Sequence, residues 1–83
     1  MNRRQTKICK YLGFVLRHHP EAIGIQPEAY GWVEIDALVA NANAAGKSIT
    51  RELVLQVVEL DERKAFVISD DGQRIRAVVG NAN

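Results

Sequence analysis

The residues of this chain that could do chemistry gather in the segment FVLRHHP at residues 14–20. An apolar run there ends in Arg17, His18 and His19, and Pro20 follows directly. Arginine can bind phosphate oxygens through two parallel hydrogen bonds, and histidine can move a proton near neutral pH. The segment therefore predicts either the end of an ordinary helix, whose dipole favours cations, or part of a phosphate-handling site.

A second basic pair, Arg74 and Arg76, lies two residues apart in an alternating segment. Side chains at this spacing share one face of a strand. The pair predicts either an anion clamp or an edge strand that its charges protect from aggregation. We expect Trp32 to pack against the core or another domain rather than to stack on a base.

Composition limits the classes of protein to which the chain can belong. Its 83 residues, 47% of them apolar, predict one globular domain. The single cysteine, Cys9, excludes an internal disulfide, and the adjacent His18 and His19 have poor spacing for a metal site. No apolar run approaches the roughly 20 residues of a membrane span. We therefore expect a cytoplasmic protein that binds neither a metal nor a membrane.

Charge is unevenly distributed along a chain whose net charge is only +1. Residues 1–19 carry five basic side chains and no acid, whereas residues 20–45 carry four acids and no base. This segregation indicates either a solvated helix face or a partner that bears phosphate.

Three helices are expected to position these residues, at about 6–18, 36–45 and 50–60, because apolar residues recur there at helical spacing. Pro20 ends the first helix, since a residue before proline is pushed out of helical geometry. The candidate caps are Thr6 for the first helix, Asp36 for the second and either Ser48 or Thr50 for the third.

A β-hairpin is predicted at the C-terminal end, where residues 66–79 alternate on both sides of the turn sequence DDG. A short extended piece is expected at Trp32 and Val33. Three helices, a short strand and a hairpin predict an α+β fold, and specifically a winged helix over residues 1–80 with a tail at 81–83.

Winged helices often read DNA with their third helix, but the one predicted here exposes Glu52 and Glu59. Two carboxylates would oppose DNA phosphates, which disfavours a DNA-binding regulator. A protein-interaction winged helix without a phosphate site stays open as an alternative. It predicts an exposed apolar patch around Trp32, Val67 or Val78.

Four segments carry a resemblance to a known family: LGFVLRHHPEAIGI, GWVEIDAL, ITRELVLQVV and DDGQRIRAVVG. In this order and spacing they resemble the N-terminal lobe of the NAD-dependent RNA 2′-phosphotransferases, over about residues 8–80. The resemblance implies a winged helix that holds RNA bearing a 2′-phosphate. It also implies a second lobe, of the ADP-ribosyltransferase type, that holds NAD and follows directly.

The resemblance further implies a reaction that removes an internal RNA 2′-phosphate left at a splice junction. In the family, the phosphate attacks the nicotinamide ribose and nicotinamide leaves. The adjoining ribose hydroxyl then displaces the RNA, which gives ADP-ribose cyclic phosphate and a 2′-hydroxyl. By the same resemblance, Arg17 and His18 match the catalytic Arg-His pair, and Arg76 matches a hairpin position at the phosphate site.

Three departures from the family pattern stand in this sequence. Ala65 occupies the position of a further first-lobe arginine; on a strand, Arg63 would share its side and bind phosphate, whereas Lys64 would face away. Val79, Gly80 and Asn81 replace a QGH motif, and we expect no NAD lobe within residues 1–83. We therefore expect these 83 residues to bind RNA phosphate and no cofactor, and not to catalyse the full reaction alone.

Overall fold

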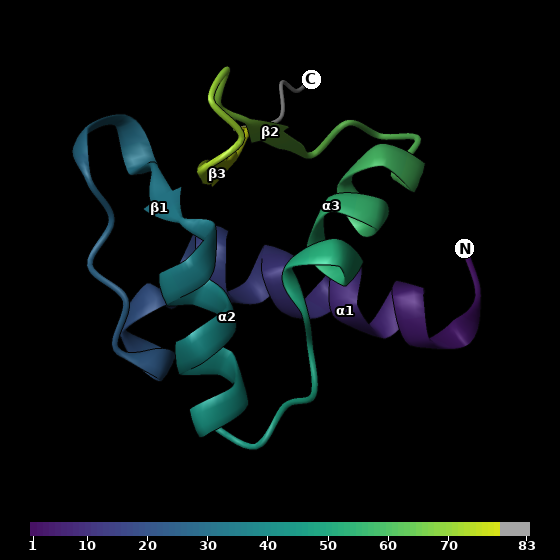
Figure 1. Cartoon of the computed structure of the whole chain (residues 1–83), viewed down its shortest axis with the longest axis horizontal. Helices are drawn as coiled ribbons and strands as arrows, with labels where there is room; N and C mark the ends of the chain where they lie inside the picture. The colour runs from purple at the N-terminus through teal and green to yellow at the C-terminus, as the bar shows by residue number, and fades with distance from the viewer. Residues whose placement is uncertain (79–83) are drawn as a thin grey trace.

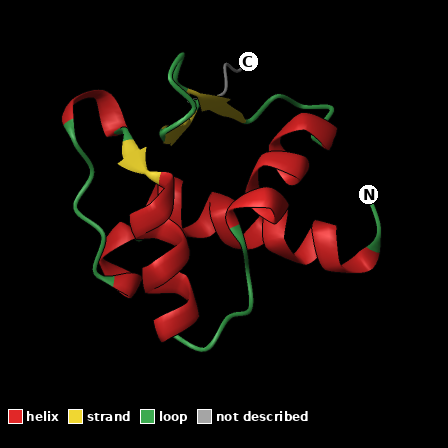
Figure 2. Cartoon of the chain, in the orientation of Figure 1, coloured by secondary structure: helices red, strands yellow, loops and turns green. Residues whose placement is uncertain are grey.

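The computed structural model describes residues 1–78, in which three helices lie on one side of a small sheet (Figure 1, Figure 2). The α+β class predicted from the sequence is confirmed. The helices are α1 (Arg3–Gly13), which continues into a π-helical turn η1 (Phe14–His18), then α2 (Ile35–Ala44) and α3 (Arg51–Leu60). The strands are β1 (Val33–Glu34), β2 (Phe66–Ile68) and β3 (Arg74–Ala77), and two short 3₁₀ turns are η2 (Pro20–Ile23) and η3 (Ala29–Gly31).

The sheet is antiparallel, with the strand order β1-β3-β2. The predicted hairpin is present, with Phe66 opposite Ala77 and Ile68 opposite Ile75. On its other side β3 pairs with β1, where Val33 lies opposite Ile75. The strand that carries Arg74 and Arg76 is therefore central, and the interpretation of these arginines as protection for an edge strand is wrong. A two-residue strand leaves no periodicity in the sequence from which this pairing could be read.

The core joins one apolar face of each helix to the inner face of the sheet. Leu12, Ile35, Leu38 and Ile75 are completely buried, and Phe66 closes the cluster from the hairpin. In Figure 1, α1 crosses behind α2 and α3, and α1 packs directly against α3. The N-terminal end of α1 therefore lies beside the loop after α2, and its C-terminal end lies beside the turn after α3.

The helix starts differ from two of the predicted caps. Asn2, rather than Thr6, caps α1: its side chain accepts a hydrogen bond from the Gln5 backbone N–H at 2.8 Å, and the Gln5 side chain accepts one from the Asn2 N–H at 2.9 Å. This reciprocal capping box starts the helix earlier. Asp36 lies inside the first turn of α2 rather than before it. Thr50 caps α3, as one of the two predicted alternatives, by accepting from Leu53 N–H at 3.1 Å.

Within residues 1–78, none of the helices combines the length and the apolar character that crossing a bilayer requires.

Candidate functional site

A cleft of about 420 Å³ opens between the end of the first helix and the turn that joins α3 to β2. Four cationic side chains line it: Lys10, Arg17, Arg63 and Lys64. Ala65 lines the same cleft, so the structure brings the position of the expected third arginine beside Arg17. The remaining lining residues are Cys9, Gly13, Asp61, Phe66 and Val78.

Arg17 reaches the cleft from the π-helical turn η1, which the His19 N–H closes by donating to the Phe14 carbonyl at 3.0 Å. Such wide turns within helices occur frequently at functional sites. The Arg17 guanidinium donates through Nη2 to the Val78 carbonyl at 3.2 Å. Because the Val78 N–H in turn donates to the Ala65 carbonyl at 2.8 Å, this contact ties η1 to the start of the hairpin.

The turn that carries Arg63, Lys64 and Ala65 is held by the buried side chain of Asp61, which is 4% exposed. Its carboxylate accepts from the backbone N–H of Arg63 at 3.2 Å and from that of Ala65 at 2.9 Å. Its backbone carbonyl accepts from Lys64 N–H at 3.1 Å, and Lys64 is left-handed at φ 53°. Asp61 thus stabilises a conformation that non-glycine residues rarely adopt.

This turn corrects the expectation that Lys64 faces away from Ala65. Alternation applies to strands, but β2 begins only at Phe66, so residues 62–65 do not alternate. Arg63 and Lys64 both line the cleft. Sequence reasoning also missed Asp61, although an Asp directly after a helix and before a short basic loop is a recognisable turn signal.

The cleft carries a net positive charge because four cationic side chains line it and Asp61 is the one carboxylate among its described lining residues. The pKa of the Cys9 thiol is raised by burial and, to a smaller degree, by the nearby Asp61 carboxylate, while Arg63 acts in the opposite direction. Cys9 is therefore a neutral thiol at neutral pH rather than a nucleophile. The arrangement is suited to binding an anion rather than to attacking a substrate.

His18 and His19 lie outside this group of cations. His18 ends η1 and is exposed, and it is not among the described residues that line the cleft. His19 binds the Glu21 carboxylate through Nδ1 at 3.0 Å, and its ring lies 5.0 Å from that of Phe14. The structure therefore places His18 next to Arg17 along the chain but outside the lining of the cleft, with its side chain accessible to solvent.

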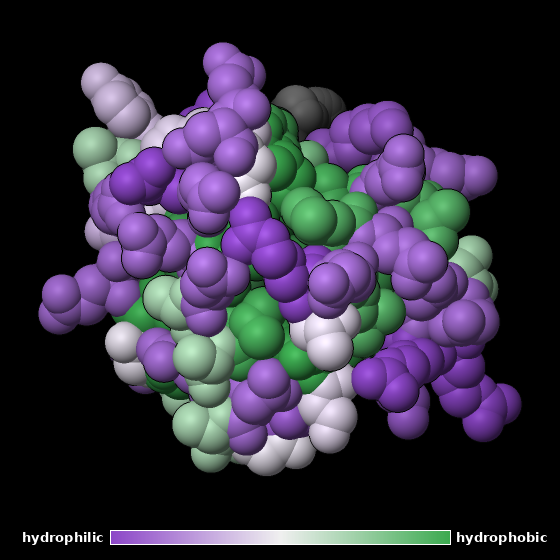
Figure 3. Space-filling model, in the orientation of Figure 1, coloured by the Kyte–Doolittle hydropathy of each residue, from purple (hydrophilic) through white to green (hydrophobic). Residues whose placement is uncertain are grey.

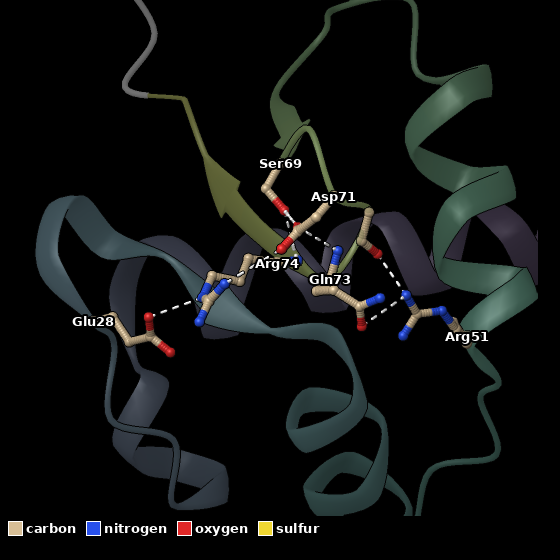
Figure 4. Close-up of polar contacts among 7 residues, drawn as sticks. Glu28, Arg51, Ser69, Asp71, Gln73 and Arg74 are labelled. Atoms are coloured by element: carbon tan, nitrogen blue, oxygen red, sulfur yellow. Dashed lines mark hydrogen bonds and ion pairs between the residues drawn. The ribbon is translucent and has the colours of Figure 1, made fainter.

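The hairpin arginines are occupied by partners within the chain. Figure 4 shows Arg74 between Glu28 and Asp71, with Nε donating to Glu28 at 2.9 Å. Arg76 lies over the Trp32 ring at 5.0 Å and donates weakly to the Tyr30 carbonyl at 3.5 Å. Neither arginine is among the described residues that line the cleft.

Arg51, the first residue of α3, is also held in place. It pairs with Asp36 at 2.7 Å and donates to the Gly72 carbonyl. It also donates to the Gln73 side chain, as Figure 4 shows. These contacts tie the start of α3 to the hairpin turn. The part of the chain that the structure describes contains no group of three His, Cys, Asp or Glu side chains placed to hold a metal ion.

Comparison with known proteins decides the family. The model of the family "RNA 2′-phosphotransferase, Tpt1 / KptA family" matches residues 3–82. The chain belongs to this family. The RNA 2′-phosphotransferase resemblance seen in the sequence motifs is thereby confirmed.

Several relatives are named probable RNA 2′-phosphotransferases. One from Rhodopirellula baltica is 52% identical over 81 residues, which cover 98% of this chain and 44% of the relative. One from Pseudomonas syringae pv. tomato is 48% identical over 83 residues, covering 99% and 44%. The chain thus spans less than half the length of these relatives. The replaced QGH motif, at Val79, Gly80 and Asn81, lies outside the described residues.

Proposed function

We propose that these 83 residues form the RNA-binding, winged-helix lobe of an RNA 2′-phosphotransferase, and that the cleft at the end of α1 receives the 2′-phosphate. The convergence of Arg17 with Arg63 and Lys64 carries this proposal. Arg17 lies more than 40 positions before Arg63 and Lys64 in sequence, and the three meet in a concave site without an ion pair to any described carboxylate. An excess of cations over carboxylates in a cleft favours a multiply charged anion.

In this proposal, each cation has a distinct task. Arg17 binds phosphate oxygens with its guanidinium, which the Val78 carbonyl already orients. Arg63 and Lys64 supply further positive charge from the opposite wall. His18, exposed next to Arg17, turns toward the cleft to hydrogen-bond the phosphate, and Arg76 shapes the site indirectly through its contact with Trp32.

The transfer chemistry belongs to a second lobe of the family type, which would hold NAD. That lobe would supply the nicotinamide ribose as electrophile, while the cleft would hold the attacking 2′-phosphate in position. Ala65 removes one cation from the family set, so this lobe binds phosphate more weakly than one with arginine there. On their own, the 83 residues bind the RNA and do not release nicotinamide.

An NMR titration of the ¹⁵N-labelled chain tests the proposal. The probes are a trinucleotide that carries an internal 2′-phosphate and the same trinucleotide with a 2′-hydroxyl, both at low salt because phosphate contacts weaken steeply with ionic strength. We expect the phosphorylated probe alone to shift the amides of residues 17, 18 and 63–65. Equal responses to the two probes, or none at these residues, would contradict the phosphate site.

A further inference from the structure

A second hollow, of about 480 Å³, lies along the N-terminal half of α1, away from the phosphate cleft. It contains four cationic side chains: Arg3, Arg4, Lys7 and Lys47. The other described lining residues are Ile8, Tyr11 and Ser48, and none of the described lining residues is a carboxylate. Figure 3 shows strongly hydrophilic side chains gathered over this end of the molecule. We refer to this hollow as the basic groove.

The basic groove has a fixed shape, because the loop after α2 forms one wall and is tied to α1. Arg4 donates through Nη2 to the Ser48 carbonyl at 2.8 Å. The Lys47 ammonium lies 4.8 Å from the centre of the Tyr11 ring, as in a cation–π contact. Two of the four cations are thus positioned in advance, whereas Arg3 and Lys7 form no ion pair among residues 1–78.

Helix stability does not account for these cations. Arg3 and Arg4 stand in the first turn of α1, which has no acidic residue, and the positive end of the helix dipole disfavours cations there. The uncharged pair of Asn2 and Gln5 already caps the helix. Arg4 is held by the Ser48 carbonyl, but no carboxylate among residues 1–78 pairs with Arg3 or Lys7, which leaves both available to an anion outside the chain.

The position of the basic groove relative to the phosphate cleft suggests what that anion is. Both are built on the same helix, with Lys7 in the groove and Arg17 in the cleft. Ten residues of helix separate them by about 15 Å along the axis, and their α1 residues face different sides of the helix, so a strand that reaches both must also pass around it. A stacked strand rises about 3.4 Å per nucleotide, so at least four to five nucleotides bridge this distance.

We propose that the basic groove binds the sugar-phosphate backbone of the RNA strand that flanks the 2′-phosphate, at least four nucleotides away from it. This inference rests on the proposed function, because the strand is the one whose 2′-phosphate occupies the cleft. The contacts are to phosphates and not to base edges, so they position the RNA without reading its sequence. RNA that extends several nucleotides beyond the modified nucleotide should therefore bind more tightly than a shorter RNA.

Two oligonucleotides of different length separate the groove from the cleft. The trinucleotide with an internal 2′-phosphate reaches only the cleft, whereas a 12-mer with the same modified nucleotide near one end also reaches the groove. The test variant is Lys7→Gln with Lys47→Gln. The matched control is Gln26→Glu with Ala40→Glu, at two exposed positions outside the groove, since both double variants change the net charge from +1 to −1.

Fluorescence anisotropy at several salt concentrations gives the result. We expect the groove variant to bind the 12-mer about tenfold more weakly at 50 mM salt, and its salt slope to fall by about 1.4, which corresponds to two lost phosphate contacts on a single strand. Its affinity for the trinucleotide should stay within about twofold of wild type. The control variant should lose less than about twofold for both probes.

Equal losses of affinity for the 12-mer in the groove variant and the control variant would overturn the proposal that the basic groove binds RNA. The change in net charge would then explain the effect. Wild-type binding to phosphatidylserine vesicles or to polyglutamate as tight as to the 12-mer would overturn the assignment to RNA. Failure of the trinucleotide to bind in preference to its 2′-hydroxyl form would instead contradict the phosphate cleft. The two proposals therefore fail on different probes.

Discussion

The phosphate cleft and the hairpin carry similar numbers of basic residues but use them in opposite ways. In the hairpin region, Arg74 binds two carboxylates and Arg51 binds a carboxylate and a carbonyl. In the cleft, Arg17 donates to a carbonyl and to no carboxylate among residues 1–78, and Asp61 accepts hydrogen bonds from backbone N–H groups. The cations of the cleft therefore stay available to a ligand, whereas Arg74 and Arg51 are held by carboxylates within the chain.

Whether an arginine can bind a ligand therefore depends on whether a carboxylate within the chain already pairs with it. An exposed ion pair contributes little stability, but it still occupies the donors that a phosphate would need. Within the described residues, the hairpin's acids lie on the η3 loop and the hairpin turn, next to Arg74. Asp61, the carboxylate that lines the cleft, is buried, and its oxygens accept hydrogen bonds from the backbone.

The strongest test of this contrast is Asp61→Ala. Because the carboxylate accepts two backbone hydrogen bonds in a buried position, its loss should lower the free energy of unfolding by about 2–4 kcal/mol. Urea denaturation measures this change. Glu62→Ala, at the exposed neighbouring position, is the matched control and should change stability by no more than about 0.5 kcal/mol. Unchanged stability together with tighter phosphate binding would mean that Asp61 instead neutralises the cleft.

The next test compares one arginine from each region. Arg17→Gln should weaken binding of the 2′-phosphorylated trinucleotide by about 10- to 100-fold, since a charge-assisted hydrogen bond contributes about 1.5–3 kcal/mol. Arg74→Gln removes the same charge from the hairpin and should change the affinity by less than about twofold. Isothermal titration calorimetry at one low salt concentration measures both. Similar losses in the two variants would break the distinction between available and neutralised arginines.

Ala65→Arg should sharpen the contrast by adding a cation to the cleft. The backbone of residue 65 bonds to Asp61 and Val78 whatever its side chain, so the turn should keep its conformation. We expect about fivefold tighter binding of the 2′-phosphorylated trinucleotide, or about 1 kcal/mol. Ala40→Arg, on the exposed face of α2, controls for net charge and should leave the affinity nearly unchanged. An equal gain in the control would contradict a specific role for residue 65.

The smallest effect concerns the acid that helps to neutralise Arg74. The pKa of Asp71 is held below its usual value, chiefly by the Ser69 hydroxyl at 2.6 Å and then by the Gln73 N–H. A lowered pKa in the folded state gives stability that is present above the unfolded pKa of about 3.9 and is lost as pH falls through the folded value. Wild type should therefore exceed Asp71→Asn in stability at pH 7, and the gap should begin to narrow below about pH 4, as the pH approaches the lowered pKa of Asp71 in the folded state. A pH-independent gap in thermal melts would contradict this.

The sequence by itself determined the α+β class, the three helices, the hairpin and the family. These features depend on local signals: apolar spacing, the Thr50 cap, the DDG turn and motifs in order along the chain. It also predicted Arg17 as a site residue, and the structure places that residue in the lining of the cleft. The caps of α1 and α2 were misplaced. The capping box of Asn2 and Gln5 starts α1 before Thr6, and α2 begins at Ile35, after Glu34, without a side-chain cap.

Which basic side chains can bind a ligand became clear from the tertiary structure. Whether Arg74 meets Glu28, 46 residues away, or Arg17 meets the turn at residues 63–65, depends on how the helices pack and on β1 pairing with β3. Strand alternation predicted that Lys64 faces away, but the Asp61 carboxylate bends the chain there into a turn. The interaction between two charges depends on their distance in space, and the order of residues along the chain does not specify that distance.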